Sequence, residues 1–168
     1  MKVYHGSLDV VEHPIILNPN RSLDYGKGFY TTTSEKQARE WVERRMAETH
    51  STCGYVNVYD LDEKKLALLN RLTFTEPTEE WADFVVANRT IKDFTHNYDV
   101  VYGPVANDRV YLQFGLYEAG AIGLGTLIRE LKTYKLVDQY LYFQDRSALL
   151  ASPPSPSERS GEGEGGDA

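Results

Sequence analysis

The chain has 168 residues, 41% hydrophobic and 12% aromatic, so it can bury one ordinary core but not two. Its net charge of −7 repels phosphate backbones and gives no footprint for non-specific nucleic-acid binding. The sequence has no apolar run of about 18 residues and no secretion signal, and its single cysteine, Cys53, excludes an internal disulfide and a thiolate metal cluster. These features predict a soluble, cytoplasmic, metal-free protein that contacts no membrane.

Two short strands and a helix are expected near the N-terminus. The strands are residues 2–5 and 29–32, with a loop rich in proline, asparagine and glycine between them. Ser34 to Gln37 has the pattern of a capping box, in which a serine and a glutamine satisfy each other's exposed amides. We therefore expect a helix over residues 34–48, with apolar residues at helical spacing on its inward face. These are Ala38, Trp41, Val42 and Met46.

The middle of the chain predicts a hairpin and a second helix. Residues 54–61 alternate as a strand does, and residues 65–69 are expected to pair with them through the intervening turn. Pro77 suits the first turn of a helix that continues to about Asn88. Its apolar face consists of Trp81, Phe84 and Val85.

The last third predicts two strands with helices between them. The strands are residues 99–105 and 139–143. One helix is capped by Asn107 or Asp108 and ends at Gly120, and another covers residues 126–134. Their inward residues are Val110, Phe114, Tyr117, Leu127, Ile128 and Leu131. Strands at both ends with helices inserted between them predict an α+β fold rather than an alternating doubly wound one.

The composition changes near the C-terminus. From Ser152 onward the chain contains proline, serine, glycine and glutamate but no large apolar residue. Such a segment cannot offset the entropy lost on ordering. We expect one domain over residues 1–151, followed by a disordered tail over residues 152–168.

Two glycine-containing motifs carry the chemistry. The first, Tyr4-His5-Gly6-Ser7, places an imidazole, a bare backbone position and a hydroxyl at a strand end, where they could hold a ribose and a planar carboxamide. A histidine in a plain turn is the alternative, and it is the commoner explanation of this motif alone.

The second motif is Gly26-Lys27-Gly28-Phe29-Tyr30. Its glycines let the backbone approach a ligand closely, and Tyr30 could lay its ring on a cationic heterocycle. A tight loop with a core aromatic is again the alternative. A dinucleotide-binding fingerprint is rejected because no helix follows directly and the acidic residue about twenty positions on is missing.

Together the two motifs resemble the donor site of ADP-ribosyltransferases of the diphtheria-toxin and poly(ADP-ribose) polymerase branch, in which a helix carrying an alanine and an aromatic follows. The resemblance implies the split-sheet fold of that family, with flanking helices, and NAD⁺ as co-substrate. It implies that His5 holds a ribose hydroxyl, that Gly6 binds the nicotinamide carboxamide with support from Ser7, and that Tyr30 stacks on nicotinamide. The implied cofactor-binding set also includes Tyr4, Gly28 and Phe29.

The third motif of that family is a late strand that reads Asn-Glu-Tyr in the polymerases. This chain has Asp138-Gln139-Tyr140, so Gln139 stands where the glutamate holds the nicotinamide ribose. An amide keeps the hydrogen bond but not the negative charge that stabilises an oxocarbenium-like ribose. We therefore expect single transfer rather than chain elongation, with His5, Tyr30 and Gln139 as the catalytic set.

Further polar residues are expected to contact the diphosphate or the acceptor, although helix capping and surface ion pairing explain them equally well. They are Asn88, Arg89, Asn107, Asp108 and Arg109. The acid or base that Gln139 does not supply could be Asp108, Glu118 or Asp138, and the sequence does not choose among them.

Over residues 1–150 the chain is also similar to a family of small bacterial proteins grouped with ADP-ribosyltransferases and often described only as a domain of unknown function. The segments 84–89 and 103–111 carry this similarity. Genes of that family commonly adjoin a small partner gene, which implies a toxin-like effector with a neutralising antitoxin protein. The predicted function is NAD-dependent mono-ADP-ribosyl transfer to a protein or nucleic acid. The alternatives are an NAD glycohydrolase and a catalytically silent NAD-binding or interaction module.

Overall fold

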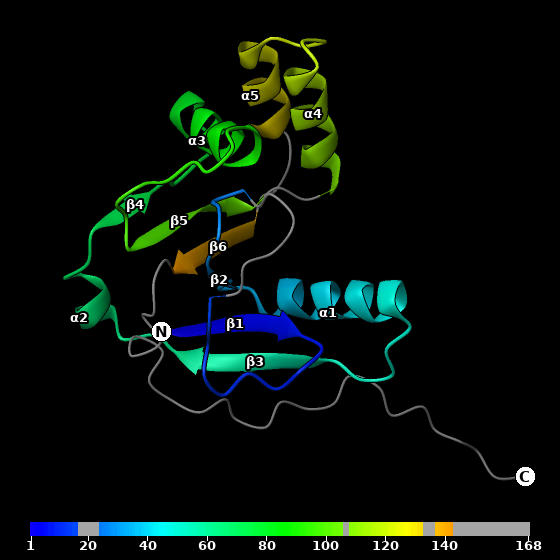
Figure 1. The fold of residues 1–168 in the computed structure, drawn as a ribbon, viewed down its shortest axis with the longest axis vertical. Coiled ribbons are helices and arrows are strands. Elements are labelled where there is room, and N and C mark those ends of the chain that lie inside the picture. The colour runs from blue at the N-terminus through cyan, green and yellow to red at the C-terminus, as the bar shows by residue number, and fades with distance from the viewer. Residues whose placement is uncertain (17–23, 106–107, 133–136, 143–168) are drawn as a thin grey trace, which may run out of the picture.

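The structure is a computed structural model, which describes residues 1–16, 24–105, 108–132 and 137–142. Its elements are, in chain order, β1 (Lys2–Ser7), β2 (Phe29–Thr31), α1 (Glu35–Thr49), β3 (Tyr55–Asp60), α2 (Glu63–Leu66), β4 (Arg71–Thr73), α3 (Glu79–Thr90), β5 (Val100–Val105), α4 (Asp108–Glu118), α5 (Leu124–Lys132) and β6 (Val137–Tyr142) (Figure 1). The strands form two separate sheets, of order β1-β3 and β2-β6-β5-β4. The predicted α+β class is therefore confirmed.

The smaller sheet is an antiparallel pair covered by α1. Lys2 of β1 lies opposite Asp60 of β3, and the pairing continues along the whole strand. Ala38 and Val42 of α1 pack on Val56 in a small apolar cluster. Figure 1 shows α1 running alongside β1.

The predicted capping box of α1 is only half right. The Ser34 hydroxyl accepts from the Gln37 N–H at 3.2 Å, as expected. The Gln37 side chain, however, lies 2.7 Å from the Thr32 hydroxyl, and the Ser34 N–H donates to that hydroxyl at 3.1 Å. Thr32 thus takes the place expected for Gln37. Because Thr32 directly follows β2, this arrangement fixes the start of α1 to the end of that strand.

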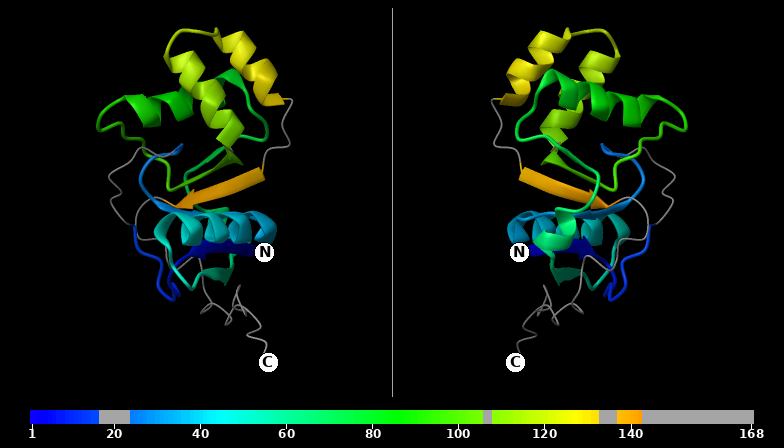
Figure 2. Two further views of the ribbon diagram at one scale, coloured as in Figure 1. Left: turned by 90° about the vertical axis from the view of Figure 1, so that its right-hand side faces the viewer. Right: turned by 90° about the vertical axis from the view of Figure 1, so that its left-hand side faces the viewer.

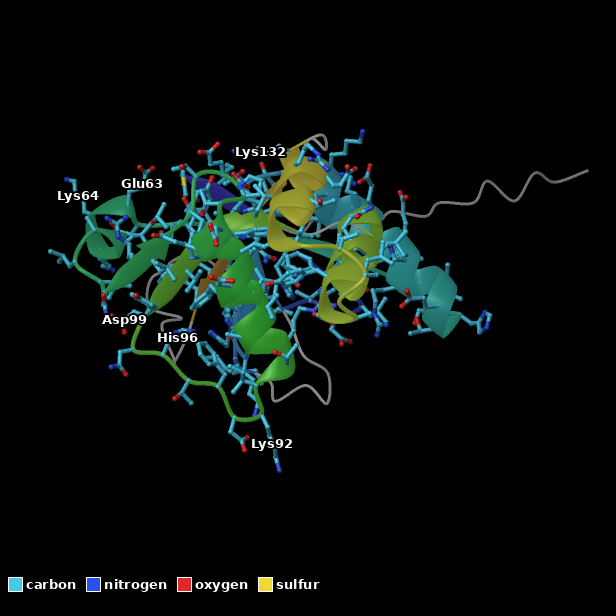
Figure 3. The ribbon with its side chains drawn as sticks, turned by 90° about the horizontal axis from the view of Figure 1, so that it is seen from above. Glu63, Lys64, Lys92, His96, Asp99 and Lys132 are labelled. Atoms are coloured by element: carbon cyan, nitrogen blue, oxygen red, sulfur yellow. The ribbon has the colours of Figure 1, made fainter. Side chains whose placement is uncertain are left out.

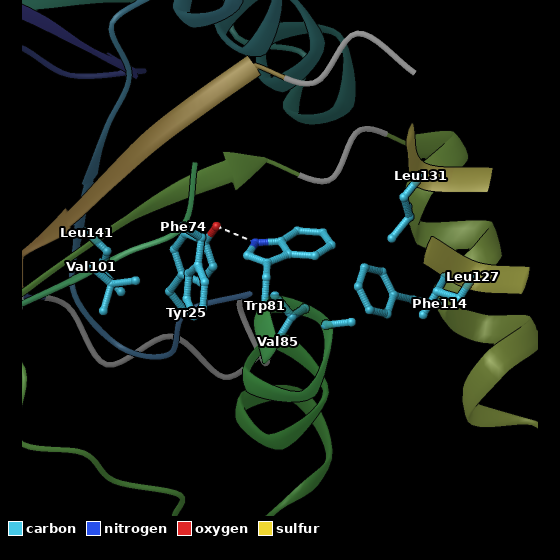
Figure 4. Close-up of a cluster of buried hydrophobic side chains, with 10 residues drawn as sticks. Tyr25, Phe74, Trp81, Val85, Val101, Phe114, Leu127, Leu131 and Leu141 are labelled. Carbon is cyan, nitrogen blue, oxygen red and sulfur yellow. Dashed lines mark hydrogen bonds between the residues drawn. The ribbon is translucent and has the colours of Figure 1, made fainter. Parts of the chain in front are cut away.

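The larger sheet has its last strand in the middle. β6 pairs antiparallel with β2 on one side and with β5 on the other, and β4 runs parallel to β5. The helices α3, α4 and α5 gather over this sheet, at the end of the molecule away from β1 and β3, as Figure 2 shows from two further sides. Between them lies the main core (Figure 4), whose buried members are Tyr25, Phe74, Trp81, Ala82, Val85, Val101, Phe114, Leu127, Leu131 and Leu141.

The hairpin predicted between residues 54–61 and 65–69 is wrong. β3 forms as expected, but its partner is β1, and the segment that follows it is the short helix α2. The cause is local. The Asp62 carboxylate accepts from the amides of Lys64 and Lys65 at 3.0 and 3.1 Å, which caps a helical turn.

Three smaller differences concern helices and segment ends. Thr78 caps α3 by accepting from the Trp81 N–H at 3.2 Å, so Pro77 lies before the cap rather than in the first turn. Trp41, expected to face inward, is 37% exposed. The expected helix and strand ends at residues 134 and 143, and the tail over residues 152–168, lie outside the described residues. No helix within the described ranges is long and apolar enough to cross a membrane.

Candidate functional site

Besides a shared apolar cluster that includes Val3, Phe29 and Tyr59, a single backbone bridge joins the two sheets within the part of the chain that the structure describes. The Tyr4 N–H donates to the Thr32 carbonyl at 2.8 Å, and the Thr32 N–H donates to the Tyr4 carbonyl at 2.9 Å. In a regular antiparallel ladder, Gly6 and Tyr30 would form the next hydrogen-bonded pair. They do not pair, and beyond the bridge the backbones of β1 and β2 separate. We call the place where they part the seam.

The imidazole of His5 takes the position of the missing ladder bond. Its Nδ1 lies 2.7 Å from the Tyr30 carbonyl oxygen. A carbonyl can only accept, so Nδ1 carries the proton of the neutral ring and Nε2 carries the lone pair. Burial lowers the pKa of His5 and outweighs the opposing effect of the Tyr30 hydrogen bond. The ring is therefore neutral at pH 7, with Nε2 as a hydrogen-bond acceptor.

Gly6 turns its peptide groups toward the seam. Alternate residues of a strand direct their N–H and C=O to the same side, and Tyr4 directs both of its groups to Thr32. The N–H and C=O of Gly6 therefore face away from β3, and neither bonds to any residue that the structure describes. A Cβ at Gly6 would lie 2.6 Å from the Ala38 carbonyl oxygen and 2.9 Å from Val42 Cγ2. Only glycine fits here, because α1 packs directly on the backbone.

An exposed indole borders the same place. Trp41 Cε3 lies 3.2 Å from the position that a Cβ on Gly6 would occupy, so the ring sits beside the open peptide groups. The Arg45 guanidinium lies 5.7 Å from the centroid of the indole. Helical spacing alone assigned Trp41 to the core. A large aromatic at the margin of an apolar helix face was the signal that could have indicated otherwise.

Tyr30 and Gln139 project from the same face of the larger sheet. Tyr30 lies opposite Leu141 on β6, and Gln139, two residues before Leu141, points to the same side as Leu141. Gln139 is buried, with 9% of its surface exposed. The Tyr30 hydroxyl donates to the Gly26 carbonyl at 2.6 Å and accepts from the Tyr25 N–H at 3.3 Å. These bonds fix the Tyr30 ring against the turn that precedes β2.

The His5 ring lies on the other side of the strand from the Tyr30 ring. It packs on Phe29 with ring centroids 4.4 Å apart, and Phe29 alternates with Tyr30 along β2. The His5 ring is thus hydrogen-bonded to the backbone of Tyr30. The Tyr30 ring lies on the same face of the larger sheet as Gln139. The three predicted catalytic residues come from adjoining strands, with the His5 ring on one side of β2 and the Tyr30 and Gln139 side chains on the other.

Two of the three alternative acids are already bound to other groups. The Asp138 carboxylate accepts from the Thr33 hydroxyl at 2.5 Å and from the Tyr102 hydroxyl at 2.8 Å. Glu118 Oε1 lies 3.5 Å from Arg89 Nε. Asp108 begins α4, and Asn107 before it lies outside the described residues.

The remaining predicted contacts have local roles. Asn88 donates to the Phe84 carbonyl at 2.8 Å within its own helix. Ser7 accepts from the Asp9 N–H at 3.1 Å. A Cβ at Gly28 would lie 2.6 Å from the Tyr142 carbonyl oxygen, so close packing on β6 is enough to require this glycine. Arg109 lies in the first turn of α4. Among the described residues, histidines, cysteines and carboxylates do not gather in threes to hold a metal.

Comparison with known proteins gives one match. A family model described as "Protein of unknown function (DUF3990)" matches residues 1–150. No curated protein and no solved structure matches the chain. The matched range contains both sheets and the seam between them.

Proposed function

The chain belongs to the DUF3990 family, and we propose that it binds NAD⁺ at the seam and transfers ADP-ribose from it to a macromolecular acceptor. The observation that carries this proposal is the pair of open peptide groups at Gly6. A nicotinamide carboxamide offers an oxygen that accepts and an NH₂ group that donates. The Gly6 N–H and C=O are the matching donor and acceptor.

The groups around Gly6 suit the rest of the nicotinamide riboside. Trp41 presents a partly exposed indole beside Gly6, and an indole face attracts a cationic ring such as the nicotinamide of NAD⁺. The neutral His5 ring offers Nε2, which can accept a hydrogen bond from a ribose hydroxyl. In this proposal Tyr30 gives the nicotinamide its second aromatic neighbour, in keeping with the family resemblance.

The proposed reaction breaks the bond between nicotinamide and the ribose C1′. Nicotinamide leaves with the bonding electron pair, a nucleophile of the acceptor forms the new bond to C1′, and the proton of that nucleophile is released. Gln139 would orient the ribose through its amide. Because an amide carries no charge, the rate enhancement would come mainly from positioning, and a slow single transfer is the expected outcome.

A second candidate is a protein that binds NAD⁺ and hydrolyses it or leaves it intact. It is favoured by Gln139, and by the commitment of the neighbouring Asp138 carboxylate to Thr33 and Tyr102. Incubation with labelled NAD⁺, with and without bacterial lysate, separates these possibilities. Label on macromolecules supports transfer, free nicotinamide without such label supports hydrolysis, and binding alone supports the silent module. No binding at all would refute the whole proposal.

Variants of the proposed site sharpen the test. His5→Ala and Tyr30→Ala are expected to abolish labelling, whereas Gln139→Glu is expected to raise it. Leu68→Ala, at a highly exposed residue after α2, is the control and should label as the wild type does. The toxin-like role predicts that expression slows bacterial growth and that His5→Ala relieves the effect. Full labelling by both alanine variants would show that the site has been assigned wrongly.

A further inference from the structure

Tyr25 is a core residue that belongs to no helix or strand. It lies at the end of the long connection between β1 and β2, yet its ring is fully buried in the main core, between α3 and β5 (Figure 4). Trp81 Nε1–H donates to the Tyr25 hydroxyl at 2.7 Å, and that hydroxyl donates to the Pro104 carbonyl at 2.6 Å. The side chain is therefore held from α3 and from β5.

The backbone of the same residue holds Tyr30. The Tyr25 N–H donates to the Tyr30 hydroxyl at 3.3 Å, and this hydroxyl donates to the carbonyl of Gly26 at 2.6 Å. Gly26 has φ +92°, a conformation that residues with a side chain rarely adopt, so the turn has a specific shape. A path of hydrogen bonds thus runs from the Trp81 indole, through Tyr25, to the Tyr30 ring.

A second tether lies one residue earlier. Asp24 is 4% exposed, and its Oδ1 lies 3.8 Å from Arg89 Nη1. Arg89 also approaches Glu118 of α4, and its guanidinium lies 5.5 Å from the centroid of the Phe114 ring. Two consecutive residues just before the glycine turn, Asp24 and Tyr25, are therefore both held by side chains of α3.

We propose that Tyr25 is a positioning residue, through which α3 and β5 set the placement of the Tyr30 ring at the NAD⁺ site. The inference rests on the proposed function for its kinetic consequence. Its structural content, that the Tyr25 hydroxyl orders the turn over residues 25–30, is independent of any reaction.

Tyr25→Phe tests the inference, because it removes one hydroxyl and keeps the buried ring. Tyr59→Phe is the matched control, since Tyr59 is also fully buried and its hydroxyl donates to a backbone carbonyl, that of Val11, at 2.6 Å. Both variants are expected to lower the melting temperature. Only Tyr25→Phe is expected to raise KM for NAD⁺, by about tenfold, because a shifted ring weakens binding while kcat changes less. Equal KM values in the two variants would overturn the inference.

A double variant shows whether Tyr25 acts through Tyr30. In a Tyr30→Phe background the acceptor of the Tyr25 N–H is already lost, so Tyr25→Phe should then change KM by less than about twofold. A tenfold effect in both backgrounds would show that Tyr25 acts by another route, and it would overturn the inference.

Hydrogen exchange without NAD⁺ separates this inference from the proposed function. Tyr25→Phe should speed exchange of the backbone amides of residues 25–30, and Tyr59→Phe should not. If the wild type does not bind or turn over NAD⁺ and this pattern appears, the proposed function fails while the positioning by Tyr25 stands. If exchange over residues 25–30 is the same in both variants, the inference is wrong whatever the turnover.

Discussion

The two halves of the molecule are held together in different ways. The half built on β2, β6, β5 and β4 has a core of large side chains, with Trp81 and Phe114 packed at a ring distance of 5.6 Å. The half built on β1, β3 and α1 has a small cluster of its own, Ala38, Val42 and Val56, and close backbone packing at Gly6. Its Val3 and Tyr59 pack in a second core together with residues of the larger sheet. The comparison teaches that the larger half is stabilised by an extensive apolar core of its own, whereas the smaller half depends on close packing of α1 at Gly6 and on apolar contacts shared with the larger sheet. The open peptide groups at Gly6 lie in the smaller half, where α1 packs on the backbone.

The largest expected effect is in the large core. Trp81→Ala should lower the free energy of unfolding by about 3–5 kcal/mol, because it leaves a cavity and removes the hydrogen bond from the indole N–H to the Tyr25 hydroxyl. Val42→Ala in the small half should cost about 1–3 kcal/mol, since it buries fewer methylene groups. Urea unfolding of both variants measures the difference. Equal losses would show that the halves do not differ in the way described.

Backbone proximity is tested by adding a single methyl group. Gly6→Ala should destabilise the fold by about 1–3 kcal/mol, because its Cβ would overlap the Ala38 carbonyl, and it should also weaken NAD⁺ binding at the proposed site. Gly115→Ala is the matched control. It lies within α4 with no atom near its added Cβ, and it should stabilise the protein by about 0.5–1 kcal/mol. A stabilising Gly6→Ala would contradict the close packing of α1 on β1.

A smaller effect is expected from pH, through one histidine in each half. Burial lowers the pKa of His5 at the seam and of His96, which lies in the loop between α3 and β5 beside Phe84 and Tyr98 (Figure 3). Below the usual histidine pKa of about 6.5 the unfolded chain binds protons that the folded one excludes. Stability should therefore fall as the pH drops through 6.5 toward the lowered values.

Substitution of each histidine tests whether these two residues cause the pH dependence of stability. His5→Gln and His96→Gln should each flatten the decrease in unfolding free energy between neutral and mildly acidic pH, because a glutamine does not titrate there. Chemical denaturation at a series of pH values gives the comparison. An unchanged slope in both variants would mean that other groups, such as carboxylates, cause the pH dependence.

The smallest effect is expected on the outer surface of α1. Glu35 and Arg39 pair at 2.7 Å one helical turn apart, and both are solvent-exposed. Arg39→Ala should cost only about 0.3–0.5 kcal/mol, and less in high salt. A loss as large as that of Gly6→Ala would show that surface charge, rather than backbone contact, holds the small half together.

Local signals predicted most of the helices and strands. Ser34 caps α1 as predicted, and Gly120, with φ +71°, follows the end of α4 as expected. The error over β3 has a physical reason. Its partner is β1, some fifty residues away, and the alternating pattern of a strand says nothing about which distant strand will pair with it. β4 was missed because three residues are too few to show a period.

The candidate site was predictable in part. Sequence motifs indicated His5, Gly6 and Tyr30, and the structure places all three where β1 and β2 part. The bond from the His5 ring to a backbone carbonyl could not be predicted, since it depends on where the ladder stops. Tyr25 was overlooked as well. A large aromatic directly before a glycine turn, in a connection otherwise rich in polar residues, was the available signal.

The central position of β6 has a consequence for the synthesis of the protein. A ribosome releases the chain from the N-terminus, so β2 and β5 emerge long before the strand that lies between them. Until residues 137–142 appear, both strands keep an unpaired edge, and Gln139 has not yet been made. The nascent protein therefore passes through most of its translation with the larger sheet incomplete, and the proposed site, which includes Gln139, can form only when nearly the whole domain has been released.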